Sequence, residues 1–135
     1  MTQEDKKLLL KDLCARLPYG VKVLVDNKHW CDFDGRTPSK ITFDNSYRLL
    51  FLGTELGYVK PYLFPLSSMT EEQKREYYSL KHEVPVCHYE YGDVVEEFEL
   101  YDSPESFEYL IENHFDYRGL IPMGLAEDAT DKNIY

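Results

Sequence analysis

The stretch that decides the predicted fold runs from residue 21 to residue 59, "VKVLVDNKHWCDFDGRTPSKITFDNSYRLLFLGTELGYV". Short segments rich in β-branched, aromatic and large aliphatic residues alternate there with pairs that tolerate tight turns, such as Asp34-Gly35 and Gly53-Thr54. Because these segments are short and closely spaced, they predict an antiparallel β-meander that can curl into a small, partly open barrel. The predicted strands are 21–25, 29–33, 41–43, 47–52 and 55–59.

Helices are predicted on both sides of this meander. Thr2 can cap a first helix, whose leucines recur at helical spacing until Pro18 stops it. A second helix opens with Thr70 and Gln73, which form a capping box, and it has few apolar residues, so we expect it to be mostly exposed. Ser103 caps a third helix, which is amphipathic.

Two prolines restrict the chain that follows the meander. Pro61 and Pro65 lack a backbone N–H, so any strand in "KPYLFP" is expected at the edge of a sheet. Further on, "VVEEFELY" (94–101) alternates well enough from Glu97 to Tyr101 to predict a strand with Phe98 and Leu100 pointing inward. The fold class is therefore predicted to be α+β, with about five to six strands and about three flanking helices.

The length of 135 residues fits a single domain. We expect one α+β domain over residues 1–126 and a polar C-terminal tail over residues 127–135. Within that tail, Ile134 and Tyr135 are the residues that can dock on the domain.

The composition narrows the class of protein. A hydrophobic content of 43% allows a folded core, and no apolar run is long enough to cross a membrane. The first ten residues show no cleavable-signal pattern, and Cys14, Cys31 and Cys87 have no paired spacing, which is typical of reduced thiols. We therefore expect a cytoplasmic protein that makes no membrane contact.

The net charge of −10 is spread unevenly along the chain. Residues 82–135 hold 14 acidic side chains against two basic ones, and no Lys or Arg lies between Tyr89 and Tyr117. Such a surface repels phosphate, so direct nucleic-acid binding is not expected there. The N-terminal half has an excess of only two positive charges, which makes it a weak candidate for that role; its cations include Lys6, Lys7, Lys11, Arg16, Lys22 and Lys28.

"NHFDYRGLIPMGLA" (113–126) places His114, Asp116 and Arg118 at alternate positions where the third helix should end. One interpretation is structural: an imidazolium at the helix end complements the helix dipole, and Asp116 pairs with Arg118 to fix the exit of the chain. The alternative is catalytic, with His114 as a base oriented by Asp116 while Arg118 holds an anion. Both interpretations stay open at this level.

No metal or cofactor is predicted. A ligand set of His82 and Cys87 with His29 and Cys31 lacks the paired spacing of structural zinc sites. The segment 32–35 begins like a calcium loop, but its glycine comes too early. The glycines form no phosphate-binding motif.

Three stretches, "CARLPYGVKV" (14–23), "VKPYLFPLSSMTEEQKREY" (59–77) and the segment 113–126, cover 43 of the 135 residues. Together they resemble a family of small uncharacterised proteins from genomes, prophages and mobile elements of gut anaerobic bacteria. The resemblance implies no activity, cofactor or catalytic residue. The region 78–112 departs most from that pattern.

The predicted function is that of a non-enzymatic accessory or inhibitory protein of a phage or mobile element. Carboxylates and aromatic side chains alternate in its C-terminal part, where they can steer the protein to the basic surface of a host or phage protein. Nucleic-acid mimicry is a specific version of this hypothesis, and a small enzyme using His114, Asp116 and Arg118 is the alternative. The predicted interaction residues are Glu96, Glu97, Glu99, Tyr101, Glu105, Glu108 and Glu112.

Overall fold

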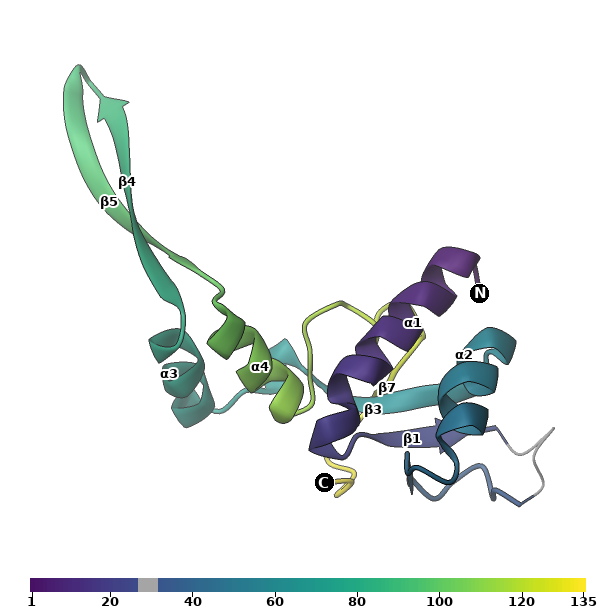
Figure 1. Ribbon diagram of the computed structural model, residues 1–135. Helices are drawn as coiled ribbons and strands as arrows, with labels where there is room; N and C mark the ends of the chain where they lie inside the picture. Colours follow the sequence, from purple (N-terminus) through teal and green to yellow (C-terminus); the bar gives the residue numbers. More distant parts are fainter. Residues whose placement is uncertain (27–31) are drawn as a thin grey trace. The chain divides into compact units, whose positions relative to one another are not determined.

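The computed structural model describes residues 1–26 and 32–135 (Figure 1). Where the sequence predicts one domain over 1–126, these residues form two compact units. Unit 1 combines Met1–Ser68 with Ile111–Tyr135, and unit 2 is Met69–Leu110, inserted between those two segments. None of the helices among the described residues is long and apolar enough to cross a membrane.

The first helix of unit 1, α1 (Gln3–Arg16), forms where the capping pattern predicts it. The Thr2 side chain accepts a hydrogen bond from the Asp5 N–H, and the Asp5 carboxylate accepts one from the Thr2 N–H. This capping box satisfies N–H groups that the first turn leaves without helical partners. A short 3₁₀ turn at Leu17–Tyr19 ends the helix, and Gly20 (φ +71°) turns the chain toward the sheet.

The sheet of unit 1 is built around one strand, β3 (Val59–Pro65). It pairs antiparallel with β1 (Lys22–Val25), which in turn pairs with β2 (Ser39–Lys40). It also pairs in parallel with two short strands from the end of the chain, β6 (Phe115–Asp116) and β7 (Glu127–Asp128). The predicted polar tail therefore begins inside the sheet.

The expectation that Pro61 and Pro65 confine this strand to an edge is wrong. The Tyr58 C=O accepts from the Asp26 N–H on one side, while the Leu63 C=O accepts from the Ala129 N–H on the other. Backbone groups of successive residues alternate in direction along a strand, so the nitrogens of both prolines face the β7 side. Pairing with β7 covers only Tyr62 and Leu63, so neither proline needs to donate there.

Most of the predicted meander after residue 40 is helical instead of extended. Residues 47–52 form a π-helical segment that runs into α2 (Gly53–Leu56), and residues 41–43 form no strand. The buried positions there are 49, 50, 53 and 54, which is the spacing of a helix face and not of a strand. Strands at 41–43 and 47–52 were therefore wrong predictions, and in 55–59 only Val59 is extended.

Of the first two predicted strands, the structure confirms one. Strand 21–25 is confirmed as β1, whereas residues 29–31 of the predicted strand 29–33 lie outside the described residues. The described chain contains four α-helices and seven strands and no closed barrel, which confirms the α+β class with sheets and flanking helices.

The core of unit 1 lies between the sheet and the helical segments. Leucines of α1, valines of β1 and β3, and residues of the 47–56 segment meet there with the end of the chain. Its buried residues are Leu9, Leu13, Val21, Val23, Val25, Ile41, Leu49, Leu50, Val59, Leu63, Leu120, Leu125 and Ala126.

Unit 2 consists of two helices and a long hairpin: α3 (Glu71–Ser79), β4 (His82–Glu90), β5 (Asp93–Tyr101) and α4 (Pro104–Glu112), whose last two residues belong to unit 1. Thr70 and Gln73 form the predicted capping box, and the Ser103 hydroxyl accepts from the Ser106 N–H at 3.0 Å. No residue of α3 is buried, as expected. The starts of both helices are thus confirmed.

Within unit 2, no second layer covers the hairpin. Tyr91 and Gly92, both with positive φ, join two strands that pair over nine positions from His82↔Tyr101 to Glu90↔Asp93. None of the eighteen strand residues is buried. The expectation that Phe98 and Leu100 point inward is therefore wrong, because both side chains are exposed and no other element of unit 2 buries a residue of the hairpin.

Close packing between α2 and β3 predicts the effect of one substitution. A Cβ atom at Gly53 would lie 2.3 Å from Cγ2 of the buried Val59. Gly53→Ala is therefore expected to destabilise unit 1 by about 1–3 kcal/mol in urea unfolding, although alanine has the higher helix propensity. Adding Val59→Ala should return part of that loss. A Gly53→Ala protein as stable as the wild type would contradict this packing.

Candidate functional site

Asp116 acts as a clamp on the loop that follows β6. Its side chain is buried, and its two oxygens accept from the backbone N–H groups of Leu120 and Ile121, each at 2.9 Å. Both carboxylate oxygens are thus engaged by the backbone. Among the described residues, no hydrogen bond or ion pair joins the Asp116 side chain to His114 or Arg118, so the predicted Asp116–Arg118 pair is wrong.

Arg118 pairs instead with Asp12 of α1, its Nε lying 3.2 Å from Asp12 Oδ1. The other oxygen of Asp12 accepts from Arg16 Nε at 2.8 Å, and Arg16 Nη2 donates to the Phe115 C=O at 2.7 Å. Asp12 and Arg16 are fully buried. One carboxylate therefore lies between two guanidinium groups, and the cluster fastens α1 to the chain that returns from unit 2.

Sequence reasoning missed this cluster, although part of it had a local signal. Asp12 and Arg16 are four residues apart in a predicted helix, a spacing at which opposite charges meet. That spacing is more often found on an exposed helix face, and nothing local indicates that the pair is buried or that Arg118 joins it.

His114 follows α4 in a left-handed backbone conformation, with φ of +64°. Its C=O accepts from the Phe64 N–H at 2.8 Å, which begins the pairing of β6 with β3. Its ring stacks on the ring of Tyr135, with centroids 3.6 Å apart and planes 10° apart. Its Nδ1 has no hydrogen-bond partner among the described residues.

The imidazole of His114 is uncharged at neutral pH. Burial, with the nearby charges of Arg16 and Lys22, lowers its pKa from 6.5 to about 4. The expected imidazolium at the helix end is therefore wrong, and the ring serves as a flat stacking surface. A group with so low a pKa is also a weak general base near pH 7.

Tyr135 completes the sheet through its side chain. Its hydroxyl accepts from the Lys22 N–H at 2.9 Å and donates to the Tyr62 C=O at 2.8 Å. Extending the β1–β3 register by one pair beyond Val23↔Pro61 would place Lys22 opposite Tyr62, so the hydroxyl stands where a direct strand hydrogen bond would form. Burial raises the pKa of Tyr135 to about 12.

The end of the chain is held by further contacts. Lys22 Nζ donates to the Ile134 C=O at 2.8 Å and lies 5.9 Å from the centre of the Tyr135 ring. The expected docking of Ile134 and Tyr135 is thus confirmed. Together with the clamp at Asp116, these contacts favour the structural interpretation of the segment 113–126 over the catalytic one, because His114 has no orienting carboxylate.

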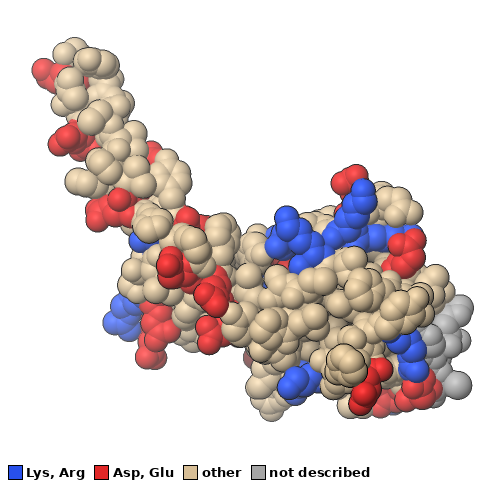
Figure 2. Space-filling view, viewed as in Figure 1, with Lys and Arg blue, Asp and Glu red and all other residues tan. Residues whose placement is uncertain are grey.

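The predicted interaction residues lie on two elements. Glu96, Glu97, Glu99 and Tyr101 belong to β5, while Glu105, Glu108 and Glu112 belong to α4; all are exposed. Unit 2 as a whole holds 12 acidic side chains against Lys74, Arg75 and Lys81. It therefore carries −9 of the total charge of −10, and Figure 2 shows acidic side chains along the hairpin.

Polar contacts hold the base of the hairpin. Tyr77 donates to the Asp102 carboxylate, Tyr109 donates to Glu76 at 3.1 Å, and Ser103 Oγ donates to the Leu80 C=O. Burial, with the Asp102 carboxylate, raises the pKa of Tyr77. The only large apolar residues buried in this unit are Met69 and Leu110.

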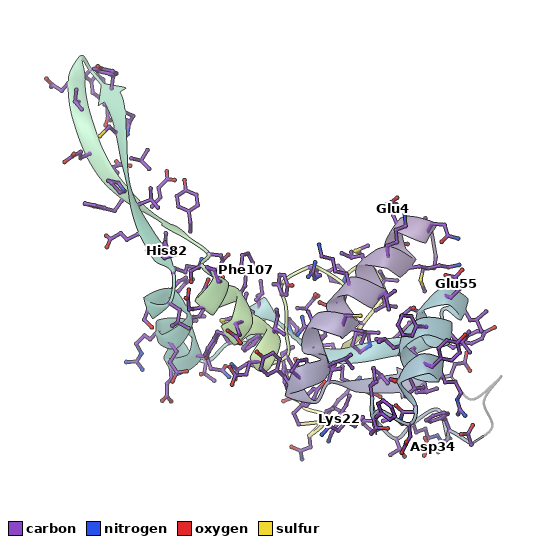
Figure 3. All side chains as sticks on the ribbon, in the orientation of Figure 1. Glu4, Lys22, Asp34, Glu55, His82 and Phe107 are labelled. Atoms are coloured by element: carbon purple, nitrogen blue, oxygen red, sulfur yellow. The ribbon has the colours of Figure 1, made fainter. Side chains whose placement is uncertain are left out.

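Among the described residues, no group of three or more His, Cys, Asp or Glu side chains is placed to hold a metal ion. His29 and Cys31 of the considered ligand set lie outside the described residues. Cys87 and His82 both belong to β4, on opposite faces of the hairpin, and Figure 3 labels His82 at its base.

No protein-family model, no curated protein and no solved structure matches the chain. The resemblance to small proteins of gut anaerobes therefore stays a prediction.

Removing Asp12 should strongly destabilise unit 1. Asp12→Ala leaves the buried Arg16 without its carboxylate, and we expect a loss of about 3–5 kcal/mol in the free energy of unfolding. The double variant Asp12→Ala/Arg16→Met should recover part of that loss, because the fully buried charge of Arg16 is removed, whereas Arg118 still lacks the Asp12 carboxylate. Urea unfolding of the two variants checks this, and equal stabilities would contradict it.

The stability of unit 1 should also depend on His114 at mildly acidic pH. The unfolded chain binds a proton at this residue below pH 6.5 and the folded chain only below about 4, so lowering the pH between these values favours unfolding. His114→Phe keeps a ring on Tyr135 and should lose less stability between pH 7 and pH 4.5 than the wild type. Carboxylates titrate in both proteins, so the difference isolates His114; identical pH profiles would contradict the assignment.

Proposed function

We propose that this protein is a non-enzymatic interaction factor that binds a partner protein with a basic surface through the β4–β5 hairpin. One observation carries the proposal. Residues 82–101 form a hairpin without a single buried residue and without Lys or Arg, and they bear six carboxylates together with exposed Tyr89, Tyr91 and Phe98.

Elementary energetics support this role. A two-stranded hairpin is marginal in water by itself, and apolar side chains that stay largely in solvent add little to its stability. Covering them with a partner would release their hydration water, which favours association. Tyrosine and phenylalanine also supply contact area with few rotatable bonds.

The charge of unit 2 sets the kind of partner. A unit that carries −9 attracts positive surfaces and repels phosphate, so the partner is a protein and not a nucleic acid. Proteins that bind nucleic acid have such basic surfaces, which makes competition with nucleic acid a specific version of the proposal. An accessory or inhibitory role toward a host or phage protein fits the resemblance noted in the sequence.

A capture experiment with matched variants tests the proposal. The tagged chain, Glu96→Lys/Glu97→Lys and the control Glu4→Lys/Asp44→Lys are each incubated with nuclease-treated lysate of the encoding organism, at low and high salt. Both variants change the charge equally, but the control residues are exposed in unit 1. We expect one protein, retained by the wild type and the control at low salt, to be lost from the hairpin variant and at high salt.

Either of two outcomes would overturn the proposal. If the three proteins retain the same set of lysate proteins, or if retention changes neither with salt nor with the hairpin charges, the hairpin is not the binding element.

A further inference from the structure

The register of the hairpin sorts its side chains into two different faces. Side chains of directly paired residues lie on the same face, and successive residues alternate. One face, here called the acidic face, carries the carboxylates Glu90, Asp93, Glu97 and Glu99. The other, here called the apolar face, carries Pro85, Cys87, Tyr89, Val94, Phe98 and Leu100, with Glu83 and Glu96 as its only charges.

The two faces differ in how far their apolar side chains are exposed. On the acidic face Tyr101 donates to Glu99, and Val86 and Val95 are partly covered. On the apolar face the exposed fractions are 82% for Tyr89, 62% for Val94, 64% for Phe98 and 50% for Leu100. Side chains stand out on both sides of the strands in Figure 3. The apolar face is therefore the one that gains most from being covered.

The order of residues along the apolar face defines what can cover it. From the base of the hairpin to its tip, the pairs are Glu83 with Leu100, Pro85 with Phe98, Cys87 with Glu96, and Tyr89 with Val94. Two carboxylates thus flank the Phe98 ring. With about 3.3 Å per residue, the four-residue step from Glu83 to the level of Glu96 spans roughly 13 Å.

We propose that the apolar face is the docking face and that it takes a strand with Lys or Arg at two positions four residues apart and an aliphatic residue midway between them. A strand has the same rise, so its two cations meet Glu83 and Glu96 while the aliphatic side chain covers Phe98. The negative charge of unit 2 favours this occupant over a second copy of the chain, whose apolar face would bring further carboxylates. The inference deepens the proposed function and rests on it.

Two synthetic peptides of equal composition provide the probe. In acetyl-TKTVTKTVT-amide the lysines and valines share one face of an extended strand, whereas acetyl-TKVTTVKTT-amide divides them between both faces. Each is titrated into the ¹⁵N-labelled full chain while amide chemical shifts are followed. We expect the first peptide to shift resonances of β4 and β5 and to bind at least about threefold more tightly than the second.

Face-specific variants complete the test. Phe98→Ser should weaken binding of the first peptide roughly tenfold and Glu96→Gln about two- to fivefold, whereas Glu97→Gln, on the acidic face, should leave it within about twofold. Cross-strand contacts between β4 and β5 are checked in each variant, so that unfolding of the hairpin is distinguished from weaker binding to the apolar face.

Equal binding of both peptides, an equal effect of Glu96→Gln and Glu97→Gln, or no shift at all would overturn the inference. The lysate capture can still succeed in each of these cases, so failure of the docking face and failure of the proposed function are separate results.

Discussion

The ion pairs made by the buried Asp12 carboxylate are the interaction on which the rest of unit 1 depends. The carboxylate lies between the guanidinium groups of Arg16 and Arg118, and Arg16 also binds the backbone of Phe115. Taking these charges out of water costs several kcal/mol per ion, which the pairing and hydrogen bonds offset. The result is a fixed position for the chain that returns from unit 2, because β6 begins at the residue that Arg16 holds.

That constraint explains how a discontinuous unit can be stable. Unit 1 is made of residues 1–68 and 111–135, and each contact between these segments closes a loop of more than forty residues. The short strands β6 and β7 bring few backbone hydrogen bonds to β3. The Asp12 cluster, the stack of His114 on Tyr135 and the Tyr135 hydroxyl between β1 and β3 add the side-chain contacts that hold the return.

Unit 2, unlike unit 1, is held together by contacts between neighbouring parts of the chain. At the starts of its two helices, Thr70 and Ser103 accept hydrogen bonds from backbone N–H groups, and the two strands of its hairpin bond to each other. Its structure therefore depends on contacts between residues close in sequence. Its apolar side chains are mostly in solvent, and its charge is strongly negative. A unit whose aromatic residues lie on its surface instead of in a core is suited to contact with another molecule.

The sequence by itself determined the features that depend on neighbours within a few residues. The starts of three helices follow from side chains that bond to the backbone three positions on, and the acidity of the region 82–112 follows from composition alone. Of the candidate site, sequence reasoning located the segment 113–126 and the docking of Tyr135, but not the partners of Asp116 and Arg118. Only the tertiary structure decided that β3 is central despite its prolines, that residues 47–56 are helical, and that Asp12 faces Arg118. Those outcomes depend on burial and on contacts between residues up to about a hundred positions apart, for which local propensity carries no signal.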